Sequence, residues 1–331
     1  MPQKVEISHR TIIFTVLLIL FLWLLAQVLD IIILVFISFI LMSAINPLID
    51  KMESWRLPRS LAIVLVYLVL WGVIGGMVAS IIPSLVDQTG RLIRLLPSAV
   101  SRIEFFNLHQ QEITQQLLAR IGSLPENLLK VTVGLFSNLL SVLTTIVVTF
   151  YLLLYHKNLG RYTSFLFGSH APKAAEAISH IERRLGAWVR GELVLMFAVG
   201  LLTYIGLIAL GVEIALPLAI LAGILELVPN IGPVISAIPA VLAALTIHPL
   251  TAAGTVCLYF VVQFLENHLL VPKVMQKAVG VNPLVSILSL MSGFRLAGPV
   301  GAILAIPVIL ILQTLGLHFF SIKNMERLGG E

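Results

Sequence analysis

Long apolar runs dominate the chain and predict helices that cross a membrane. At 1.5 Å per residue, about 20 apolar residues span the ~30 Å of hydrocarbon in a bilayer. The runs that approach this length are residues 11–29, 31–45, 61–82, 131–155, 192–210 and 251–271. The first two are separated only by Asp30 and are expected to form a helical hairpin, and Pro83 is expected to stop the third.

Two further apolar regions are interrupted by glycine and proline. The first covers residues 214–247 with a break at 229–233, and the second covers residues 284–320 with a break at 295–299. Both breaks contain Gly-Pro-Val and are followed by Ile-Pro, so we interpret them as a repeat of two broken hairpins. Such pairs point to the substrate site of a secondary transporter. Ordinary kinks in a helix bundle are the alternative. The residues expected to act as hinges or helix breaks are Pro229, Gly232, Pro233, Pro239, Gly298, Pro299, Gly301 and Pro307.

The predicted fold is therefore an all-α polytopic transmembrane protein with about six full spans and two broken hairpins, or about eight membrane segments. Its expected parts are transmembrane helices at 1–83, an extracytoplasmic helical segment at 84–130, a transmembrane helix at 131–155, a cytoplasmic amphipathic segment at 156–190, a transport core at 191–322 and a cytoplasmic tail at 323–331.

Charge bias supplies the orientation. Residues 156–190 carry six Lys or Arg against two Glu, whereas residues 84–130 carry five basic against four acidic residues. Because short cytoplasmic loops are rich in Lys and Arg, we predict that 156–190 and both termini are cytoplasmic. An apolar stripe in the cytoplasmic segment, which includes Ile181, Leu185 and Trp188, is expected to pack on the protein's own helices or on the membrane surface. Recruitment of a partner protein is the alternative.

Composition supports a protein embedded in a lipid bilayer. Hydrophobic residues make up 59% and charged residues 11% of the chain, against roughly 45–50% and about 25% in soluble domains. The mean hydropathy is +1.04. The net charge of +5 is explained by basic loops on one side of the membrane rather than by nucleic-acid binding. The single cysteine, Cys257, cannot form an intrachain disulfide and is expected to pack in the core.

Polar side chains inside the apolar sequence are the candidate site. Ionisable groups at membrane depth are tolerated where protein or a water-filled cavity surrounds them. Glu226 and Asn230 lie at the first break, and Gln263, Glu266 and Asn267 lie toward the end of the sixth span. We predict that these residues bind substrate or couple its transport.

Simpler roles remain open for the ionisable residues. Glu226 could cap a helix end, and Glu266 could pair with Lys273. Glu192 and Glu213 flank the fifth span and are expected to be solvated helix ends. Arg295, at the tip of the second hairpin, is expected to be a snorkelling anchor.

Several sequence motifs resemble the signature of the autoinducer-2 exporter family of permeases. They are Glu226-x-x-Pro229-Asn230-x-Gly232-Pro233, Gln263-Phe264-Leu265-Glu266-Asn267, Val271-Pro272-Lys273 and Gly298-Pro299-x-Gly301-Ala302-x-Leu304-Ala305-x-Pro307. Asn46-Pro47-Leu48 and Pro58-Arg59 agree with the family, whereas residues 84–130 contribute no matching motif. The resemblance implies a bacterial inner-membrane transporter. Some members export the quorum-sensing molecule autoinducer-2, and others are suggested to exchange sodium or lithium for protons. A homo-oligomer is also implied, with a pentamer described among members.

Two kinds of cargo fit the candidate residues. A small polar solute such as autoinducer-2 needs hydrogen-bonding groups, which Asn230, Gln263, Asn267 and backbone carbonyls freed by the prolines would supply. A monovalent cation exchanged for protons needs titratable carboxylates, for which Glu226 and Glu266 are the candidates. We therefore predict a secondary or facilitative permease for an autoinducer-2-like solute. The alternatives are a Na⁺(Li⁺)/H⁺ antiporter and a non-transporting membrane scaffold.

Enzymatic function is not indicated, and no cofactor or metal is expected. The chain lacks a Gly-Lys pair and therefore a P-loop, and its histidines have no metal-binding spacing. Its three aspartates, Asp30, Asp50 and Asp87, lie at span ends, which excludes a paired-aspartate intramembrane protease.

Overall fold

The computed structural model describes residues 9–100, 139–158, 165, 168, 171–229, 231–275 and 282–328, and it contains no strand within them. The main elements are α1 His9–Gln27, α2 Leu29–Ser54, α3 Arg59–Val100, α6 Leu139–Tyr155, α8 Ala171–Ala209, α9 Ala215–Leu225, α10 Ile231–Leu245, α11 Pro249–Leu265, a π-helical turn η4 Glu266–Leu270, α12 Val271–Met275 and α13 Pro283–Leu328. Within the described residues, seven helices are long and apolar enough to cross a membrane, and α9 and α10 are shorter apolar helices. The predicted all-helical polytopic fold is confirmed.

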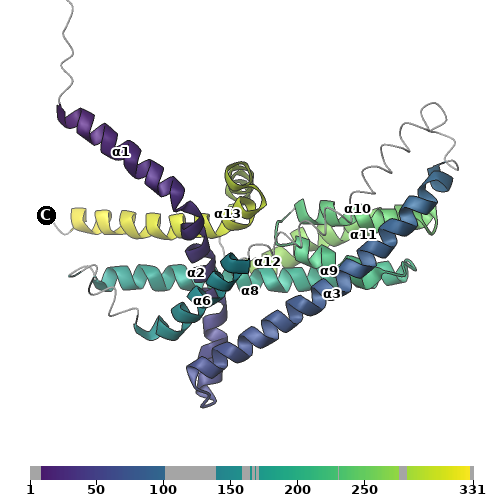
Figure 1. The fold of residues 1–331 in the computed structure, drawn as a ribbon, viewed down its shortest axis with the longest axis horizontal. Helices are drawn as coiled ribbons and strands as arrows, with labels where there is room; N and C mark the ends of the chain where they lie inside the picture. Colours follow the sequence, from purple (N-terminus) through teal and green to yellow (C-terminus); the bar gives the residue numbers. More distant parts are fainter. Residues whose placement is uncertain are drawn as a thin grey trace, which may run out of the picture.

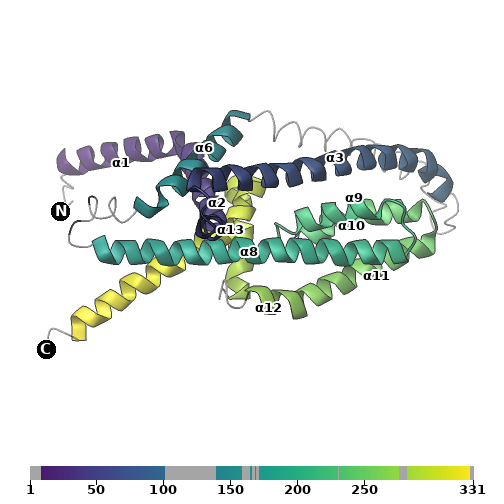
Figure 2. The same cartoon turned by 90° about the horizontal axis from the view of Figure 1, so that it is seen from below.

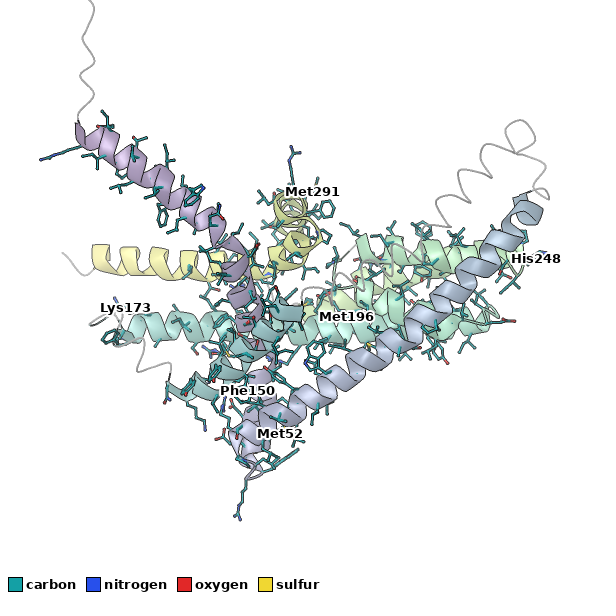
Figure 3. The ribbon with its side chains drawn as sticks, viewed as in Figure 1. Met52, Phe150, Lys173, Met196, His248 and Met291 are labelled. Carbon is teal, nitrogen blue, oxygen red and sulfur yellow. The ribbon has the colours of Figure 1, made fainter. Side chains whose placement is uncertain are left out.

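Helix α8 is the long central helix and runs along most of the length of the molecule (Figure 2). Helices α9, α10 and α11 gather beside its second half, whereas α2 and α13 contact it nearer the middle (Figure 1). Lys173 and His248 lie at opposite ends of the molecule, with Met196 between them (Figure 3). A residue near Met196 on α8 is therefore far from both ends.

Helix α8 joins two segments that the sequence pattern separated. Its continuous 39 residues join the second part of the predicted amphipathic segment, from Ala171, to almost all of the predicted fifth span, up to Ala209. Leu185 and Trp188 pack with Ile40 of α2 and with Ile306 and Leu310 of α13. The expectation that the apolar stripe packs on the protein's own helices is therefore confirmed.

Helix α3 does not stop at Pro83, so the sequence-based end of the third span is wrong. The helix continues to Val100. Proline removes one backbone donor, and in an apolar helix this more often bends the chain than ends it. The remainder of the predicted extracytoplasmic segment, residues 101–130, lies outside the described residues.

Helix α1 and several outward faces expose apolar side chains. No residue of the apolar stretch Arg10–Gln27 in α1 is buried. Helix α1 contacts α2 where the two helices join. Cys257 on α11 is also exposed, so its expected core role is wrong. In a membrane protein, lipid is as apolar as the protein core, so an apolar residue need not face inward.

The two predicted interruptions are present, and each has a tightly packed glycine. In α13, Ala297 and Gly298 leave helical geometry, and Gly298 has φ 59°. A side chain at Gly232 would strike the Leu225 carbonyl, and one at Gly301 would strike the Gly293 carbonyl. These two glycines therefore allow close approach between the arms of a hairpin.

The prolines behave differently from one another. Pro229 lies in the turn between α9 and α10, and Pro233 lies in the first turn of α10, where a missing donor is tolerated. Pro239, Pro299 and Pro307 lie inside helices, so Pro239 and Pro307 do not end them. Of these three prolines, only Pro299 follows directly after the non-helical residues Ala297 and Gly298 of α13.

The two hairpins touch each other. Val228, in the turn of the first hairpin, packs against Leu290, Ala302 and Ala305 of α13. Residues distant in sequence therefore meet at the base of the first break.

Candidate functional site

Three glutamates from three different elements are buried near the first break. They are Glu192 in α8, Glu226 at the C-terminal end of α9, and Glu266 at the start of η4. Their exposed fractions are 2%, 1% and 2%. We call these three side chains the carboxyl cluster. Such burial is unusual because glutamate is almost never fully buried unless it is paired.

A tight reversal fixes Glu226 on the inside of the first hairpin. Its amide donates to the Ala222 carbonyl at 3.1 Å, which continues α9 by one residue. The chain then turns, with the Gly232 amide donating to the Val228 carbonyl at 2.9 Å. Because Gly232 has no side chain, α10 can start directly against the end of α9.

The register of α8 against α9 places Glu192 at the same level. A side chain at Gly223 would lie 2.6 Å from the Met196 carbonyl, and one at Gly200 would lie 3.2 Å from the Ala219 carbonyl. The two helices therefore run antiparallel and in close contact. One turn beyond this crossing, Glu192 on α8 faces the end of α9 that carries Glu226.

Glu266 reaches the cluster from a π-helical turn. Such turns are rare and are often found at functional sites. The Gln263 amide donates to Glu266 Oε2 at 3.0 Å. The Glu226 and Glu266 carboxyl groups lie near enough to each other to interact directly. A hydrogen bond between two carboxyl groups forms only if one of them carries a proton.

No basic side chain that would compensate the charge of the cluster is found among the described residues. Glu192 Oε1 and Glu226 Oε2 are buried without a hydrogen-bond partner. In the described part of the chain, the salt bridges join Arg59, His156 and Lys157 to other carboxylates and include none of the three glutamates. An uncompensated buried charge is costly, so the cluster favours a bound proton or cation.

Within the described ranges, no three His, Cys, Asp or Glu side chains are grouped so that they could hold a metal ion. The arrangement suits proton transfer between neighbouring carboxyl groups, as well as transient contact with a small cation.

The five residues predicted to bind substrate or to couple its transport do not all lie together in the structure. Glu226, Glu266 and Gln263 are brought together. Asn267 is exposed, although it follows Glu266 directly. Asn230 lies outside the described residues.

Backbone acceptors near the break are partly occupied, since the Ser236 hydroxyl donates to the Pro233 carbonyl at 3.1 Å and the Tyr259 hydroxyl donates to the Ser236 carbonyl at 3.2 Å.

The simpler roles considered for these glutamates do not account for their positions. Glu226 stands at a helix end, as the capping alternative required, but its side chain is buried. Glu266 is buried whereas Lys273 is exposed, and no ion pair between them is found among the described residues. Arg295 is exposed beside the bend in α13, as expected for an anchor.

Glu192 was misjudged from the sequence, because the expectation of a solvated helix end is wrong. It lies seven and four residues after Leu185 and Trp188, and three and seven residues before Leu195 and Val199. All four of these residues are buried. This helical spacing was the available signal, since it places Glu192 on the inward face of α8. By contrast, Glu213 is exposed, in agreement with its predicted position at a helix end.

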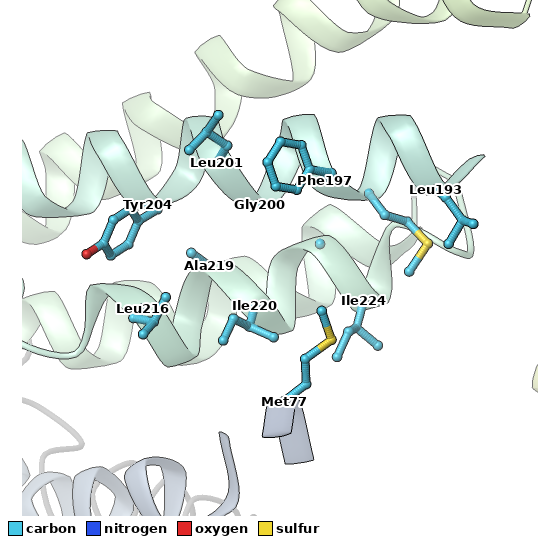
Figure 4. A pocket seen from close by; sticks show the side chains of 12 residues that line it. Met77, Leu193, Phe197, Gly200, Leu201, Tyr204, Leu216, Ala219, Ile220 and Ile224 are labelled. Atoms are coloured by element: carbon cyan, nitrogen blue, oxygen red, sulfur yellow. The ribbon is translucent and has the colours of Figure 1, made fainter. Parts of the chain in front are cut away.

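An apolar cavity of about 310 Å³ lies between α3, α8 and α9, and none of the three glutamates lines it. It is lined by Phe197, Leu201 and Tyr204 of α8 and by Leu216 and Ile220 of α9, with Met77 of α3 below α9 in the view of Figure 4. The cavity therefore offers little to a polyhydroxylated solute.

Comparison with known proteins identifies the family. Residues 12–320 match the AI-2E family transporters. YueF of Bacillus subtilis is 28% identical over 85% of this chain and 82% of its own length. The AI-2 transport protein TqsA of Escherichia coli is 27% identical over 81% and 80%. A sodium-lithium/proton antiporter of Halobacillus andaensis is 23% identical over 81% and 83%.

The chain therefore belongs to the AI-2E transporter family, as its motifs suggested. Together with the seven apolar helices, membership identifies a multi-pass transport protein of the bacterial inner membrane.

Proposed function

We propose that this AI-2E family transporter is a secondary transporter in which Glu226 and Glu266 couple proton movement to the movement of cargo. The observation that carries the proposal is the pair of buried, neighbouring carboxyl groups for which no cationic partner is found in the part of the chain that the structure describes. Buried ionisable groups in membrane proteins commonly mark ion pathways and proton relays. A scaffold protein would have no need of this arrangement.

Glu226 and Glu266 lie where a movement of the two hairpins would change which side of the membrane can reach them. Glu226 is two residues from Val228, which packs against the arms of α13. Movement of one hairpin against the other would expose the pair on one side of the membrane and then on the other. Such rocking around a fixed site is the usual basis of alternating access.

A monovalent cation is the cargo that the geometry supports best. A proton on the pair and a small cation beside the bare Glu226 Oε2 would compete for the same negative charge. Sodium or lithium would take oxygen ligands of this type. The name of the related sodium-lithium/proton antiporter supports the same exchange.

A small polar solute of the autoinducer-2 type is the second candidate. The bare carboxyl oxygens could accept hydrogen bonds from its hydroxyl groups, and TqsA, a relative, is named as an AI-2 transport protein. However, the Gln263 amide donates to Glu266, and Asn267 is exposed. Fewer side chains are therefore gathered for such a ligand than the sequence predicted.

Proton flux in proteoliposomes tests the proposal. Purified protein is reconstituted with an internal pH dye, and Na⁺, Li⁺ or autoinducer-2 is added outside in separate experiments. We expect at least one cargo to drive proton movement, and we expect Glu226→Gln to abolish it. Glu213→Gln is the matched control because Glu213 is exposed. Absence of coupled proton flux with all three cargoes would overturn the proposal, and so would full activity of Glu226→Gln.

A further inference from the structure

We infer that Arg56, in the turn between α2 and α3, binds the phosphate of an anionic phospholipid, and that Trp55 beside it lies in the headgroup layer of the membrane. The turn consists of residues 55–58, which follow α2 and lead into α3 at Arg59. The inference concerns how the protein contacts its membrane, and it is independent of the proposed proton coupling.

The α2–α3 turn lies at the level where three apolar helices end. Helices α2 and α3, which flank it, are both long and apolar enough to cross a membrane. Helix α6 ends at the same level, because Arg59 at the start of α3 donates to the Leu153 carbonyl of α6 at 2.7 Å. Irregular backbone between two spans is not tolerated in the hydrocarbon itself, so the turn lies at the surface of the bilayer.

Exposed aromatic side chains mark the same level. Trp55 is 66% exposed. Tyr151 and Tyr155 of α6, which precede and follow Leu153, are also exposed, and their rings stack on each other. Tryptophan and tyrosine are enriched at the boundary between hydrocarbon and water, where their rings lie among the lipid headgroups. Trp55 therefore lies where its ring would contact headgroups.

Arg56 has a backbone conformation that favours glycine. Among the described residues it is the one non-glycine residue with a positive φ, at 67°. It follows Trp55, the C-terminal cap of α2, and its amide donates to the Glu53 carbonyl at 2.9 Å. At this position after a helix, glycine is the usual residue, because any other places its Cβ close to a carbonyl oxygen. A side chain kept in such a position points to a functional role.

The Arg56 guanidinium is exposed and has no partner in the described part of the protein. No hydrogen bond or ion pair of this side chain is found there. The nearby carboxylates are already paired. Asp50 accepts from Arg59 at 2.7 Å. Glu53 accepts from Arg59 at 3.0 Å and from Lys157 at 2.7 Å. The Arg56 guanidinium is therefore left to bind a group outside the protein.

Phosphate is the group that fits this surface. Lys51, in the last turn of α2, is exposed like Arg56, so the outside of the turn is positively charged. A guanidinium binds phosphate through two parallel N–H donors. In the orientation predicted from the loops, the turn faces the cytoplasmic leaflet, whose anionic lipids give it a negative surface potential. A zwitterionic lipid carries its own ammonium group, so the turn favours an anionic phospholipid.

Quenching of tryptophan fluorescence by brominated lipids tests the inference on the full-length protein. The protein is reconstituted in vesicles that contain equal amounts of phosphatidylglycerol and phosphatidylcholine, with only one of the two lipids brominated. The signal of Trp55 is the difference between each protein and its Trp55→Phe counterpart. The lipid ratio is the quenching of this signal by brominated phosphatidylglycerol divided by the quenching by brominated phosphatidylcholine.

For the wild-type protein we expect a lipid ratio of about two to five, as the attraction of one basic residue to an anionic surface implies. Arg56→Asn should lower the ratio to about one, because asparagine tolerates the left-handed conformation but carries no charge. Arg56→Lys should keep part of the preference. Arg295→Asn, which changes an exposed arginine of α13, is the matched control and should leave the ratio unchanged.

Arg56→Gly separates the side chain from the backbone. Glycine relieves the left-handed strain, so the thermal unfolding temperature in detergent should stay unchanged or rise by a few degrees. The lipid ratio should nevertheless fall to that of Arg56→Asn. A lower unfolding temperature would overturn the inference, because it would show that the Arg56 side chain stabilises the turn itself.

The other outcomes are also decisive. A wild-type lipid ratio of about one, or an unchanged ratio in Arg56→Asn, would overturn the inference. Absence of Trp55 quenching by both brominated lipids would reject the placement in the headgroup layer. If the Arg56 variants do not fold, the wild-type protein decides: high salt should lower the ratio because it screens surface charge, and a ratio that ignores salt rejects the phosphate contact. None of these results alters coupled proton flux, so the proposed function is tested separately.

Discussion

Two groups of charged residues in this protein are arranged in opposite ways. At the corner between α2 and α3, the Arg59 guanidinium donates to Asp50 at 2.7 Å, to Glu53 at 3.0 Å and to the Leu153 carbonyl of α6 at 2.7 Å. Lys157 donates to the second oxygen of Glu53 at 2.7 Å. Each carboxylate of this charged corner has a cation, whereas the described residues offer none to the carboxyl cluster.

The presence or absence of a cation distinguishes two roles of charged residues. At the charged corner the charges hold helices together, whereas in the carboxyl cluster the charge can change when a proton or cation binds. A bidentate or forked arginine neutralises its partners and fixes three helices at one point. The carboxyl cluster, by contrast, keeps two oxygens without a partner. A proton or cation can therefore enter and leave there without breaking a salt bridge, which suits transport and contributes little to folding.

The largest contrast is expected between flux and stability at Glu226. Glu226→Gln should reduce coupled flux to the level of empty liposomes while the thermal unfolding temperature stays unchanged or rises, because a neutral amide replaces a buried carboxyl group that has an oxygen without a partner. Flux assays and thermal unfolding of the same preparation provide the measurement. A fall in stability that matches the fall in flux would remove the distinction between the two charged groups.

At the charged corner the reverse is expected. Arg59→Ala leaves Asp50 without its cation and the Leu153 carbonyl without its donor, and it should cost about 2–3 kcal/mol, as is typical for hydrogen bonds of a charged group. Thermal or denaturant unfolding in detergent measures the loss. Arg59→Lys keeps the charge but not the fork, so it should lose less. Wild-type stability in Arg59→Ala would show that the corner is not structural.

The packing that positions the cluster should be less costly to disturb. Gly232→Ala places a methyl group against the Leu225 carbonyl and should destabilise the hairpin by about 1–3 kcal/mol. Gly75→Ala is the control, because nothing lies within 4 Å of a side chain there, and it should be neutral or slightly stabilising. Equal behaviour of the two variants in thermal unfolding would show that the hairpin can relax.

The smallest effect is expected at the exposed end of the charged corner. Lys157 is 62% exposed at its side chain, so its bond to Glu53 is screened by water. Lys157→Ala should therefore cost about 0–1 kcal/mol. Thermal unfolding at low and at high salt checks this, since the wild-type advantage should shrink as salt increases. A loss comparable to that of Arg59→Ala would contradict the ranking.

The sequence predicted the elements of the site better than their contacts. Membrane-length runs, the break at 229–233 and the bend beside Gly298 and Pro299 all follow from local composition, and the structure contains each of them. Glu226 and Glu266 were selected because a carboxylate interrupts an apolar run. Glu192 was missed because it stands at the end of such a run, where a solvated residue is the common case.

The sequence by itself determined that this protein is an all-helical membrane protein with two broken hairpins, because helix length, apolar content and proline or glycine breaks act within a few turns. Only the tertiary structure decided that Glu192, Glu226 and Glu266 are all buried, that Glu226 and Glu266 are neighbours, and that Asn267 is exposed. The reason is physical. Lipid and protein interior are equally apolar, so hydrophobic periodicity does not tell which helix face is turned inward, and the close glycine contact between α8 and α9 makes that choice.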